Sequence, residues 1–222
     1  MSDTSKVRVF LVDDHALVRE ALRFLIGQQP DLLVCGEAED SADAAEGIAV
    51  TQPDVVIMDI SLRDGTGLDL LKSVHLQNAD AKIIILSMHD EKLYAERCIR
   101  AGAQGYVMKA ESSKRFLYAI REVMAGRLCV SEEMASVLAE KYMGLKPPAG
   151  SPLQTLSDRE LEVYNLLGKG METRQIAQSL NVSIKTVQAY CGRIKQKLGL
   201  ASGAELLREA ICWHETQGGS AG

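Results

Sequence analysis

In the first half of the chain, side chains that can do chemistry follow short apolar runs. Asp59 comes directly after residues 55–58, a β-branched and apolar run that predicts a buried parallel strand. Open α/β sheets place their sites at the carboxyl ends of the strands, which makes Asp59 a candidate chemical centre. Asp also forms turns readily, so on this run alone Asp59 equally fits the first residue of a loop. The other candidates are Asp13, Asp14, Ser87 and Lys109.

The elements that position these side chains are alternating strands and helices joined by short turns. Apolar runs predict the strands, and apolar residues at helical spacing follow each run, with Ser41 expected to cap the second helix. Five strands alternating with five helices imply right-handed crossovers and an α/β doubly wound parallel sheet covered on both faces. The predicted strands are residues 7–12, 32–35, 55–58, 82–87 and 106–108.

The carboxyl ends of parallel strands meet at one edge of such a sheet, so side chains distant in sequence converge there. Asp13 and Asp14 follow the first strand, and Asp59 follows the third. Ser87 ends the fourth strand and Lys109 follows the fifth. Clustered carboxylates repel one another unless a cation lies among them, and oxygen ligands with open water positions suit Mg²⁺. The alternative, that these acids only solvate the sheet edge, does not account for the lysine and hydroxyl at the same edge.

These residues, with Gly65 and Gly67 after the central Asp, resemble the receiver domain of bacterial two-component response regulators. The resemblance spans residues 7 to about 126. It implies a flavodoxin-like fold in which Asp59 accepts a phosphoryl group from a histidine kinase. A carboxylate can attack phosphorus when a metal and other cations neutralise the charge that spreads over the equatorial oxygens.

The resemblance also implies Mg²⁺ or Mn²⁺ as the cofactor. Asp14, Asp59 and the backbone carbonyl of Ser61 are implied as metal ligands, and Asp13 is implied to act through water. His15 offers a further ring nitrogen, but it lies at the start of the first helix. We therefore expect His15 to support the ligands or to lie at the surface rather than to bind metal itself.

Three more side chains complete the implied switch. By resemblance, Lys109 pairs with the phosphoryl oxygens, Ser87 swings its hydroxyl toward the phosphate, and Tyr106 turns inward behind it. Arg63 stands where relatives usually carry proline, which leaves the loop after the central Asp less preset. His89, two residues beyond Ser87, is expected to influence water access.

Helix-turn-helix spacing follows in the last third of the chain. Ser157 and Glu160 match a capping box at a helix start. A helix over residues 173–180 is followed by a tight turn and a longer helix over residues 184 to about 198. This geometry places the start of the second helix in the major groove of DNA.

The outward face of that longer helix is basic and carries no acid. Amides and cations can meet base edges there, while small residues permit close approach. The usual alternative is that a basic helix face is only exposed to solvent. Here the preceding helix and turn also fit a helix-turn-helix, which favours DNA binding. The buried stripe is expected at Val187, Cys191, Ile194 and Leu198. The candidate DNA-binding residues are Lys185, Thr186, Gln188, Ala189 and Gly192, with Arg193, Lys195 and Lys197 nearer the phosphates.

The segment from Leu156 to about Trp213 resembles the LuxR-type DNA-binding domain, on the motifs at residues 156–160 and 183–187. The two halves together resemble a NarL/FixJ-type response regulator. This implies binding of double-stranded promoter DNA as a homodimer, with RNA polymerase as a partner. Relatives commonly have a basic residue at position 188 and histidine at 190, whereas this chain has Gln188 and Tyr190. The DNA target therefore cannot be copied from a relative.

The composition is that of an ordinary globular chain with 222 residues, enough for two small domains. The net charge of −5 argues against a generally basic protein, although a basic surface can be local. No run approaches the roughly 18 apolar residues of a membrane span, and the start lacks a signal-peptide pattern, so we expect a cytoplasmic protein without a membrane partner. The five cysteines lack zinc-ligand spacing and are expected to be reduced.

The sequence thus predicts a transcription regulator switched by phosphorylation, and no enzyme beyond accepting and slowly losing its own aspartyl phosphate. One alternative makes Asp59 the nucleophile of a metal-dependent phosphatase, but no substrate-pocket domain or further catalytic acid is evident. Another alternative keeps DNA binding and makes it independent of phosphate. The expected regions are residues 1–127 as the receiver domain, 128–154 as a linker with a short helix, and 155–222 as a small all-α helix-turn-helix domain.

Overall fold

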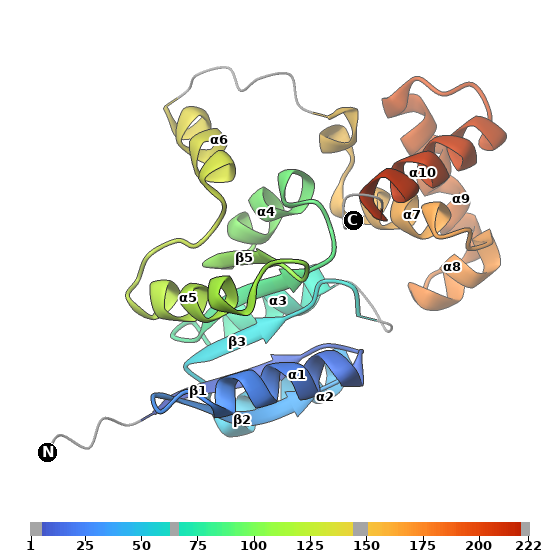
Figure 1. Cartoon of the computed structure of the whole chain (residues 1–222). Coiled ribbons are helices and arrows are strands. Elements are labelled where there is room, and N and C mark those ends of the chain that lie inside the picture. Colours follow the sequence, from blue (N-terminus) through green and yellow to red (C-terminus); the bar gives the residue numbers. More distant parts are fainter. Residues whose placement is uncertain (1–5, 63–66, 144–150, 219–222) are drawn as a thin grey trace, which may run out of the picture. The chain divides into compact units, whose positions relative to one another are not determined.

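The computed structural model describes residues 6–62, 67–143 and 151–218 of the chain. These residues form two compact units, Met1–Leu138 and Ala139–Gly222, and each is described by itself (Figure 1). Part of the predicted linker, residues 144–150, lies outside the described residues. The predicted domain boundaries stay a prediction.

The first unit contains a five-stranded parallel sheet with the strand order β2-β1-β3-β4-β5. The order reverses at β1, as in doubly wound folds, so the predicted fold class is confirmed. β2 continues three residues past the predicted end at Cys35. A Cβ at Gly36 would lie 2.4 Å from the Phe10 ring, so the glycine there lets the strand pass that ring. The strands are β1 (Val7–Val12), β2 (Leu32–Ala38), β3 (Val55–Met58), β4 (Lys82–Ser87) and β5 (Gly105–Met108).

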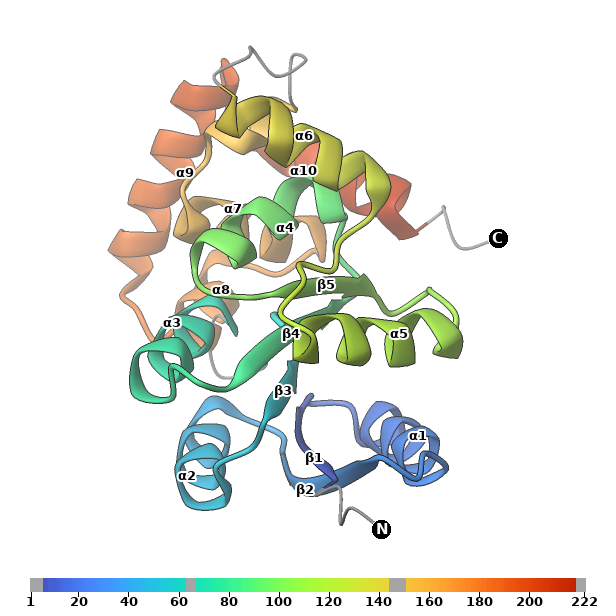
Figure 2. The ribbon, with the colours of Figure 1, turned by 90° about the vertical axis from the view of Figure 1, so that its left-hand side faces the viewer.

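Helices cover both faces of this sheet. In Figure 2, α1 and α5 lie on one side of the strands, and α2 and α3 lie on the other. Ile26 of α1 and Phe116 and Ile120 of α5 pack on the apolar side chains of the inner strands to form one core. The helices of this part of the chain are α1 (Ala16–Gly27), α2 (Ser41–Thr51), α3 (Gly67–Gln77), α4 (Glu91–Arg100), α5 (Ser113–Met124) and α6 (Glu132–Tyr142).

The prediction that Ser41 caps α2 is wrong by one residue. Asp40 occupies the cap position, and its Oδ1 accepts a hydrogen bond of 2.9 Å from the backbone N–H of Asp43. A carboxylate at this position also interacts favourably with the positive end of the helix dipole. Ser41 is therefore the first helical residue.

The second unit is helical, as predicted. The capping box of Ser157 and Glu160 is present at the start of α7, and Ser183 caps α9 by accepting from the backbone N–H of Thr186. A Cβ at Gly168 would lie 2.6 Å from the carbonyl oxygen of Ala210, so this glycine permits the close packing of α7 on α10. The elements are η1 (Pro152–Thr155), α7 (Asp158–Gly168), α8 (Thr173–Ser179), α9 (Ile184–Leu198) and α10 (Gly203–Gly218).

Membrane spans need long apolar helices. Within residues 6–62, 67–143 and 151–218, none of the helices is both long enough and apolar enough to serve as one.

Candidate functional site

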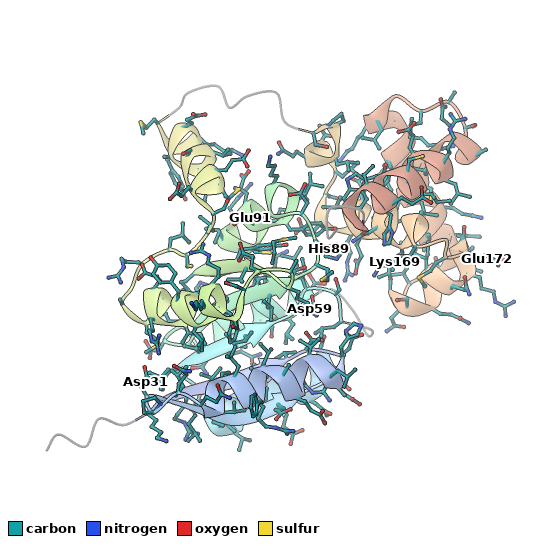
Figure 3. All side chains as sticks on the ribbon, viewed as in Figure 1. Asp31, Asp59, His89, Glu91, Lys169 and Glu172 are labelled. Atoms are coloured by element: carbon teal, nitrogen blue, oxygen red, sulfur yellow. The ribbon has the colours of Figure 1, made fainter. Side chains whose placement is uncertain are left out.

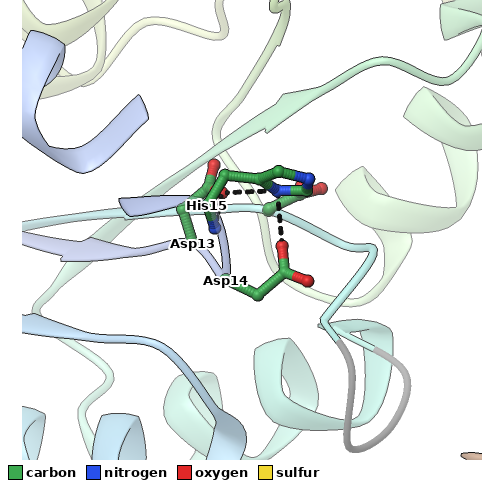
Figure 4. Close-up of side chains that lie close together, drawn as sticks. Asp13, Asp14 and His15 are labelled. Carbon is green, nitrogen blue, oxygen red and sulfur yellow. Dashed lines mark hydrogen bonds and ion pairs between the residues drawn. The ribbon is translucent and has the colours of Figure 1, made fainter. Parts of the chain in front are cut away.

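Three carboxylates meet where β1 and β3 end. These strands are neighbours, and the backbone N–H of Asp59 donates to the carbonyl of Val12 at 2.9 Å. Asp13, Asp14 and Asp59 are 2%, 8% and 3% exposed. One side-chain ligand atom from each of them and one from His15 all lie within 4.8 Å of one another. Figure 4 shows the His15 ring beside the carboxylates of Asp13 and Asp14. The structure therefore brings the predicted acids together in a largely buried group.

Lys109 places its ammonium group among these acids. Its Nζ lies 2.6 Å from Oδ2 of Asp13 and 2.6 Å from Oδ2 of Asp59. The sequence placed Lys109 at this edge but did not predict that it links two carboxylates. The backbone also fixes its position, because its N–H donates to the carbonyl of Ser87 at 2.8 Å. Lys109 thus supplies a positive charge in direct contact with Asp59, the candidate phosphoacceptor.

The charges of this group do not balance. Burial raises the pKa of Asp59, while Lys109 and the backbone N–H of Ser61 act in the opposite direction. Burial disfavours the ammonium of Lys109, but Asp59 and Asp13 outweigh burial and raise its pKa. One ammonium faces the three carboxylates of Asp13, Asp14 and Asp59. A divalent cation fits this surplus of negative oxygen donors.

Ser61 connects Asp59 to the loop that follows β4. The backbone N–H of Ser61 donates to Oδ1 of Asp59 at 2.9 Å, and its Oγ lies 2.6 Å from Nε2 of His89. The His89 ring stacks on Tyr94, with 4.7 Å between the ring centroids. His89 and Asp59 are both labelled in Figure 3, on the side of the sheet where β3 and β4 end. The sequence suggested an influence of His89 on water access but not this contact. Equal spacing in the sequence could have indicated this contact. Ser61 stands two residues after Asp59, and His89 stands two residues after Ser87, at the ends of the neighbouring strands β3 and β4.

The predicted switch residues, Ser87 and Tyr106, both contact the backbone of His89 in the loop that follows β4. Ser87 is fully buried, and its Oγ accepts from the backbone N–H of His89 at 3.1 Å. Tyr106 is also buried, and its hydroxyl donates to the carbonyl of His89 at 2.8 Å. Burial raises the pKa of Tyr106 well above its ordinary value. Tyr106 therefore already points inward, and His89 contacts both switch residues.

The glycine that begins α3 lies close to the site. A Cβ at Gly67 would come within 2.4 Å of the Cα of Ile60, which follows Asp59. Only a glycine allows α3 to begin this close to the backbone of the loop. Arg63 and Gly65, to which the sequence also assigned importance, lie outside the described residues.

The second candidate surface is the outward face of α9. Val187 and Ile194 are buried as predicted, whereas Cys191 and Leu198 are only half-buried. The guanidinium of Arg193 lies 5.5 Å from the centroid of the Tyr190 ring. The exposed candidates are Lys185, Gln188, Ala189, Gly192, Arg193 and Lys197, while Lys195 and Thr186 are half-buried.

Two of these candidates also have structural roles. Oγ1 of Thr186 lies 2.8 Å from Oγ of Ser183, and the backbone N–H of Thr186 donates to the same Ser183 oxygen. Nζ of Lys197 lies 2.6 Å from Oε2 of buried Glu160 and 3.0 Å from the carbonyl of Thr155. Lys197 thus ties α9 to the start of α7, which the sequence did not indicate.

Comparison with known proteins finds a family model for each of the two regions that carry these surfaces. Residues 9–121 match the family model of the response regulator receiver domain. The chain belongs to the response regulators. Residues 154–210 of this response regulator match the model of bacterial regulatory proteins of the luxR family. It therefore joins a receiver domain to a LuxR-type DNA-binding domain and is a DNA-binding transcription regulator rather than an enzyme in the usual sense.

Several known proteins match this response regulator along most of its length. The oxygen regulatory protein NreC of Staphylococcus carnosus is 34% identical over 210 residues, which cover 92% of this response regulator and 97% of NreC. The structure of RcsB from Salmonella typhimurium matches with a TM-score of 0.74 and 26% identity, over 94% of this chain and 98% of that chain. RcsB from Salmonella enterica serovar Typhimurium, bound to a promoter in the presence of the phosphomimetic BeF3-, matches with a TM-score of 0.71 and 25% identity, over 93% of this chain and 98% of that chain.

Proposed function

We propose that Asp59 is the phosphoacceptor of this response regulator and receives its phosphoryl group from a histidine kinase. The observation that carries the proposal is the buried Asp59 carboxylate at the end of β3, with Lys109 Nζ at 2.6 Å. An oxygen of Asp59 forms the new O–P bond while the P–N bond to the kinase histidine breaks, and the leaving imidazole keeps its electron pair and takes up a proton. Water later attacks the phosphorus slowly, so that the bond to Asp59 breaks, the carboxylate is restored and inorganic phosphate leaves.

The residues around Asp59 support this chemistry. Lys109 is placed to pair with oxygens of the phosphoryl group once that group replaces part of its contact with Asp59. Asp14, Asp59 and the carbonyl of Ser61 would hold Mg²⁺ or Mn²⁺, and Asp13 would act through water. When bound, the metal neutralises charge on the phosphoryl oxygens.

The phosphorylation signal reaches the rest of the protein through Ser87 and Tyr106. Ser87 Oγ moves from the N–H of His89 toward the phosphoryl group. Tyr106 is already inward, with its hydroxyl on the carbonyl of His89. Phosphorylation thus stabilises one conformation of the loop after β4. It increases the fraction of molecules in that conformation and leaves the fold unchanged.

The output is binding of promoter DNA by a homodimer through the start of α9. A solved relative, RcsB, is described as two dimers bound to two parallel DNAs. Lys185 and Gln188 face the groove, where Gln188 reads a base edge, while Arg193 contacts a phosphate, since all three side chains are exposed on one helix. RNA polymerase is the further partner. A cytoplasmic location fits both the phosphodonor and the DNA.

The test is labelling of the full-length protein with a small phosphodonor in Mg²⁺. We expect one acyl phosphate in the wild type and none in Asp59→Asn. Asp54→Asn is the matched control, because Asp54 lies just before the same strand and its carboxylate accepts from the N–H of Arg8. Labelling of Asp59→Asn at the wild-type level, or repeated turnover of an added phosphate ester, would contradict the proposal.

A further inference from the structure

We propose that Glu91 of α4 completes the cap of α6, and that phosphorylation of Asp59 weakens this cap through the loop after β4. The first part depends only on contacts within the first unit, whereas the second part rests on the proposed function. Glu91 is then a positioning residue, through which the switch acts on the helix that leads out of the receiver domain.

The cap of α6 is centred on Ser131. Its Oγ accepts from the backbone N–H of Met134 at 3.1 Å, and its own N–H donates to Oε1 of Glu91 at 2.8 Å. In a capping box, a Glu or Gln at the third helical position accepts from the N–H of the cap residue. In α6 this position holds Met134, whose thioether is only a weak acceptor. The missing carboxylate therefore comes from α4.

The start of α7 shows the ordinary arrangement for comparison. There the N–H of the cap residue, Ser157, donates to Oε2 of Glu160 at 2.7 Å, and Glu160 belongs to the same helix. The two caps differ only in the source of this acceptor. The start of α7 is thus independent of other helices, whereas the start of α6 depends on where α4 lies.

The segment that carries Ser131 is anchored to β5 and α5. The carbonyl of Cys129 accepts from the backbone N–H of Tyr106 in β5 at 2.8 Å. The carbonyl of Val130 accepts from the guanidinium of Arg115 in α5 at 2.7 Å. Ser131 follows directly, so its position is set by these two elements.

Glu91 is anchored to the loop after β4 instead. It lies in the first turn of α4, two residues after His89, and both are labelled in Figure 3. The N–H of His89 now donates to Oγ of Ser87. When this hydroxyl turns to the phosphoryl group, the N–H loses its acceptor and the loop must rearrange to satisfy it. Glu91 then shifts relative to Ser131, and their hydrogen bond weakens.

A second polar contact joins the same two helix starts but cannot replace the first. Nζ of Lys92 lies 2.8 Å from Oε1 of Glu133, and these side chains are 62% and 67% exposed, so solvent screens the pair. Met134 and Leu138 are buried and keep α6 packed when the cap opens. Beyond Leu138, the last residue of the first unit, α6 continues into the second unit. Weakening the cap therefore loosens the exit from the receiver domain without unfolding it.

Amide hydrogen exchange of the full-length protein, followed by mass spectrometry over residues 129–138, measures this cap. Without phosphodonor, we expect exchange at least about threefold faster in Glu91→Ala than in the wild type, because a weakened cap frees the first backbone N–H groups. Glu91→Gln should lie nearer the wild type, since its amide oxygen can still accept. Lys92→Met is the control on the same turn and should exchange as the wild type does.

The phosphodonor tests the link to Asp59. Exchange over the same residues should rise in the wild type toward the rate of Glu91→Ala, which should itself change little. The gain in DNA affinity on phosphorylation should be at least about threefold smaller in Glu91→Ala, because part of the change is present beforehand. Labelling of Asp59 should stay at the wild-type level in this variant, whereas a general folding defect would lower it.

Different results would overturn the two parts. Wild-type exchange in Glu91→Ala, or equal acceleration in Lys92→Met, would contradict the role of Glu91 in the cap. A fully labelled wild type whose exchange over residues 129–138 does not change would contradict the link to phosphorylation, and this measurement needs no variant to fold. A wild type that cannot be labelled would reject the phosphoacceptor and the link together, while the comparison without phosphodonor still decides the cap.

Discussion

The edge of the receiver sheet and the outer face of α9 differ in what fixes their side chains. At the sheet edge, Asp13 and Asp59 are buried and share the ammonium of Lys109. On α9, Lys185 and Gln188 are exposed. The first surface is organised before any ligand arrives, because the Lys109 ammonium already pairs with two of its buried carboxylates. The second surface is exposed, so under the proposed function its contribution appears in DNA binding rather than in folding.

This difference predicts how the two surfaces respond to substitution. Changes at the sheet edge should alter stability and phosphorylation together, since buried charges lose their partners. Changes on the outer face of α9 should alter DNA binding and leave stability nearly unchanged. Lys197 is the exception, because its ammonium contacts buried Glu160.

The largest effect is expected for Lys109→Met. Removing the ammonium leaves Asp13 and Asp59 as buried neighbouring carboxylates, which should lower the stability of the first unit by about 3 kcal/mol in the presence of a chelator. Calorimetry of the full-length protein measures this change. Mg²⁺ should restore part of the loss, because the ion supplies the missing positive charge.

Lys92→Met is the matched control for that experiment. Lys92 also pairs with a carboxylate, at 2.8 Å from Glu133, but both side chains are mostly exposed. Solvent screens such a pair, so its removal should leave the unfolding transition in place. Equal destabilisation by the two substitutions would mean that burial is not what distinguishes the sheet edge.

Next in size is the loss of base recognition in Gln188→Ala. We expect affinity for the preferred DNA site to fall by roughly 1–3 kcal/mol while non-specific binding persists. Competition between the preferred site, selected by the wild type from random DNA, and unrelated DNA measures both. Arg193→Ala is the companion variant, since losing a phosphate contact should weaken binding to both DNAs and reduce the salt dependence. Equal losses on both DNAs in Gln188→Ala would remove this residue from base reading.

The sequence predicted the meeting of the acids because strand order alone determines it. Once β1 and β3 are neighbours, Asp13, Asp14 and Asp59 must lie at one edge, whatever their rotamers. It did not predict that Lys109 links Asp13 to Asp59. That contact depends on how far the Lys109 side chain extends from the end of β5 past the ends of β4 and β3. No local sequence pattern determines this distance.

The same limit applies to the contacts of Glu160 with Lys197 and of Ser61 with His89. Each joins residues distant in sequence through side-chain atoms alone. The sequence identified Glu160 correctly as part of a capping box, because that motif is local. Its second role depends on the packing of α7 against α9 and appears only in three dimensions.

The pair of Glu160 and Lys197 should make the second unit sensitive to acid. Burial tends to raise the pKa of Glu160, but hydrogen bonds from Lys197 and Ser157 outweigh burial and lower it below the ordinary value of 4.5. A carboxyl group with a lowered pKa in the folded state stabilises it above the unfolded pKa, and this stabilisation is lost as the pH falls through the folded pKa.

Glu160→Gln should therefore unfold more easily than the wild type at neutral pH, and the difference should shrink below pH 4.5. The single tryptophan, Trp213, reports this unfolding by fluorescence, because its ring lies 5.7 Å from that of Tyr164 within the same unit. A difference that is constant from neutral to acid pH would show that the charge of Glu160 is not responsible.

The smallest effect is expected for Gly192→Ala. A Cβ at Gly192 meets no atom within 4 Å, so alanine should stabilise α9 by roughly 0.5–1 kcal/mol. Urea unfolding followed by Trp213 fluorescence measures this gain. Gly168→Ala should instead destabilise the unit, because its Cβ would lie 2.6 Å from the carbonyl of Ala210. Destabilisation by Gly192→Ala would indicate that the face of α9 is packed rather than open.

The central claim is that Asp59 at the sheet edge controls DNA binding by α9. The most direct measurement is the affinity of wild type and Asp59→Asn for the selected DNA site, with and without phosphodonor, alongside the dimer fraction. We predict that the phosphodonor strengthens binding and dimerisation of the wild type and changes neither in Asp59→Asn. Equal DNA affinity of Asp59→Asn and the phosphorylated wild type would contradict the account.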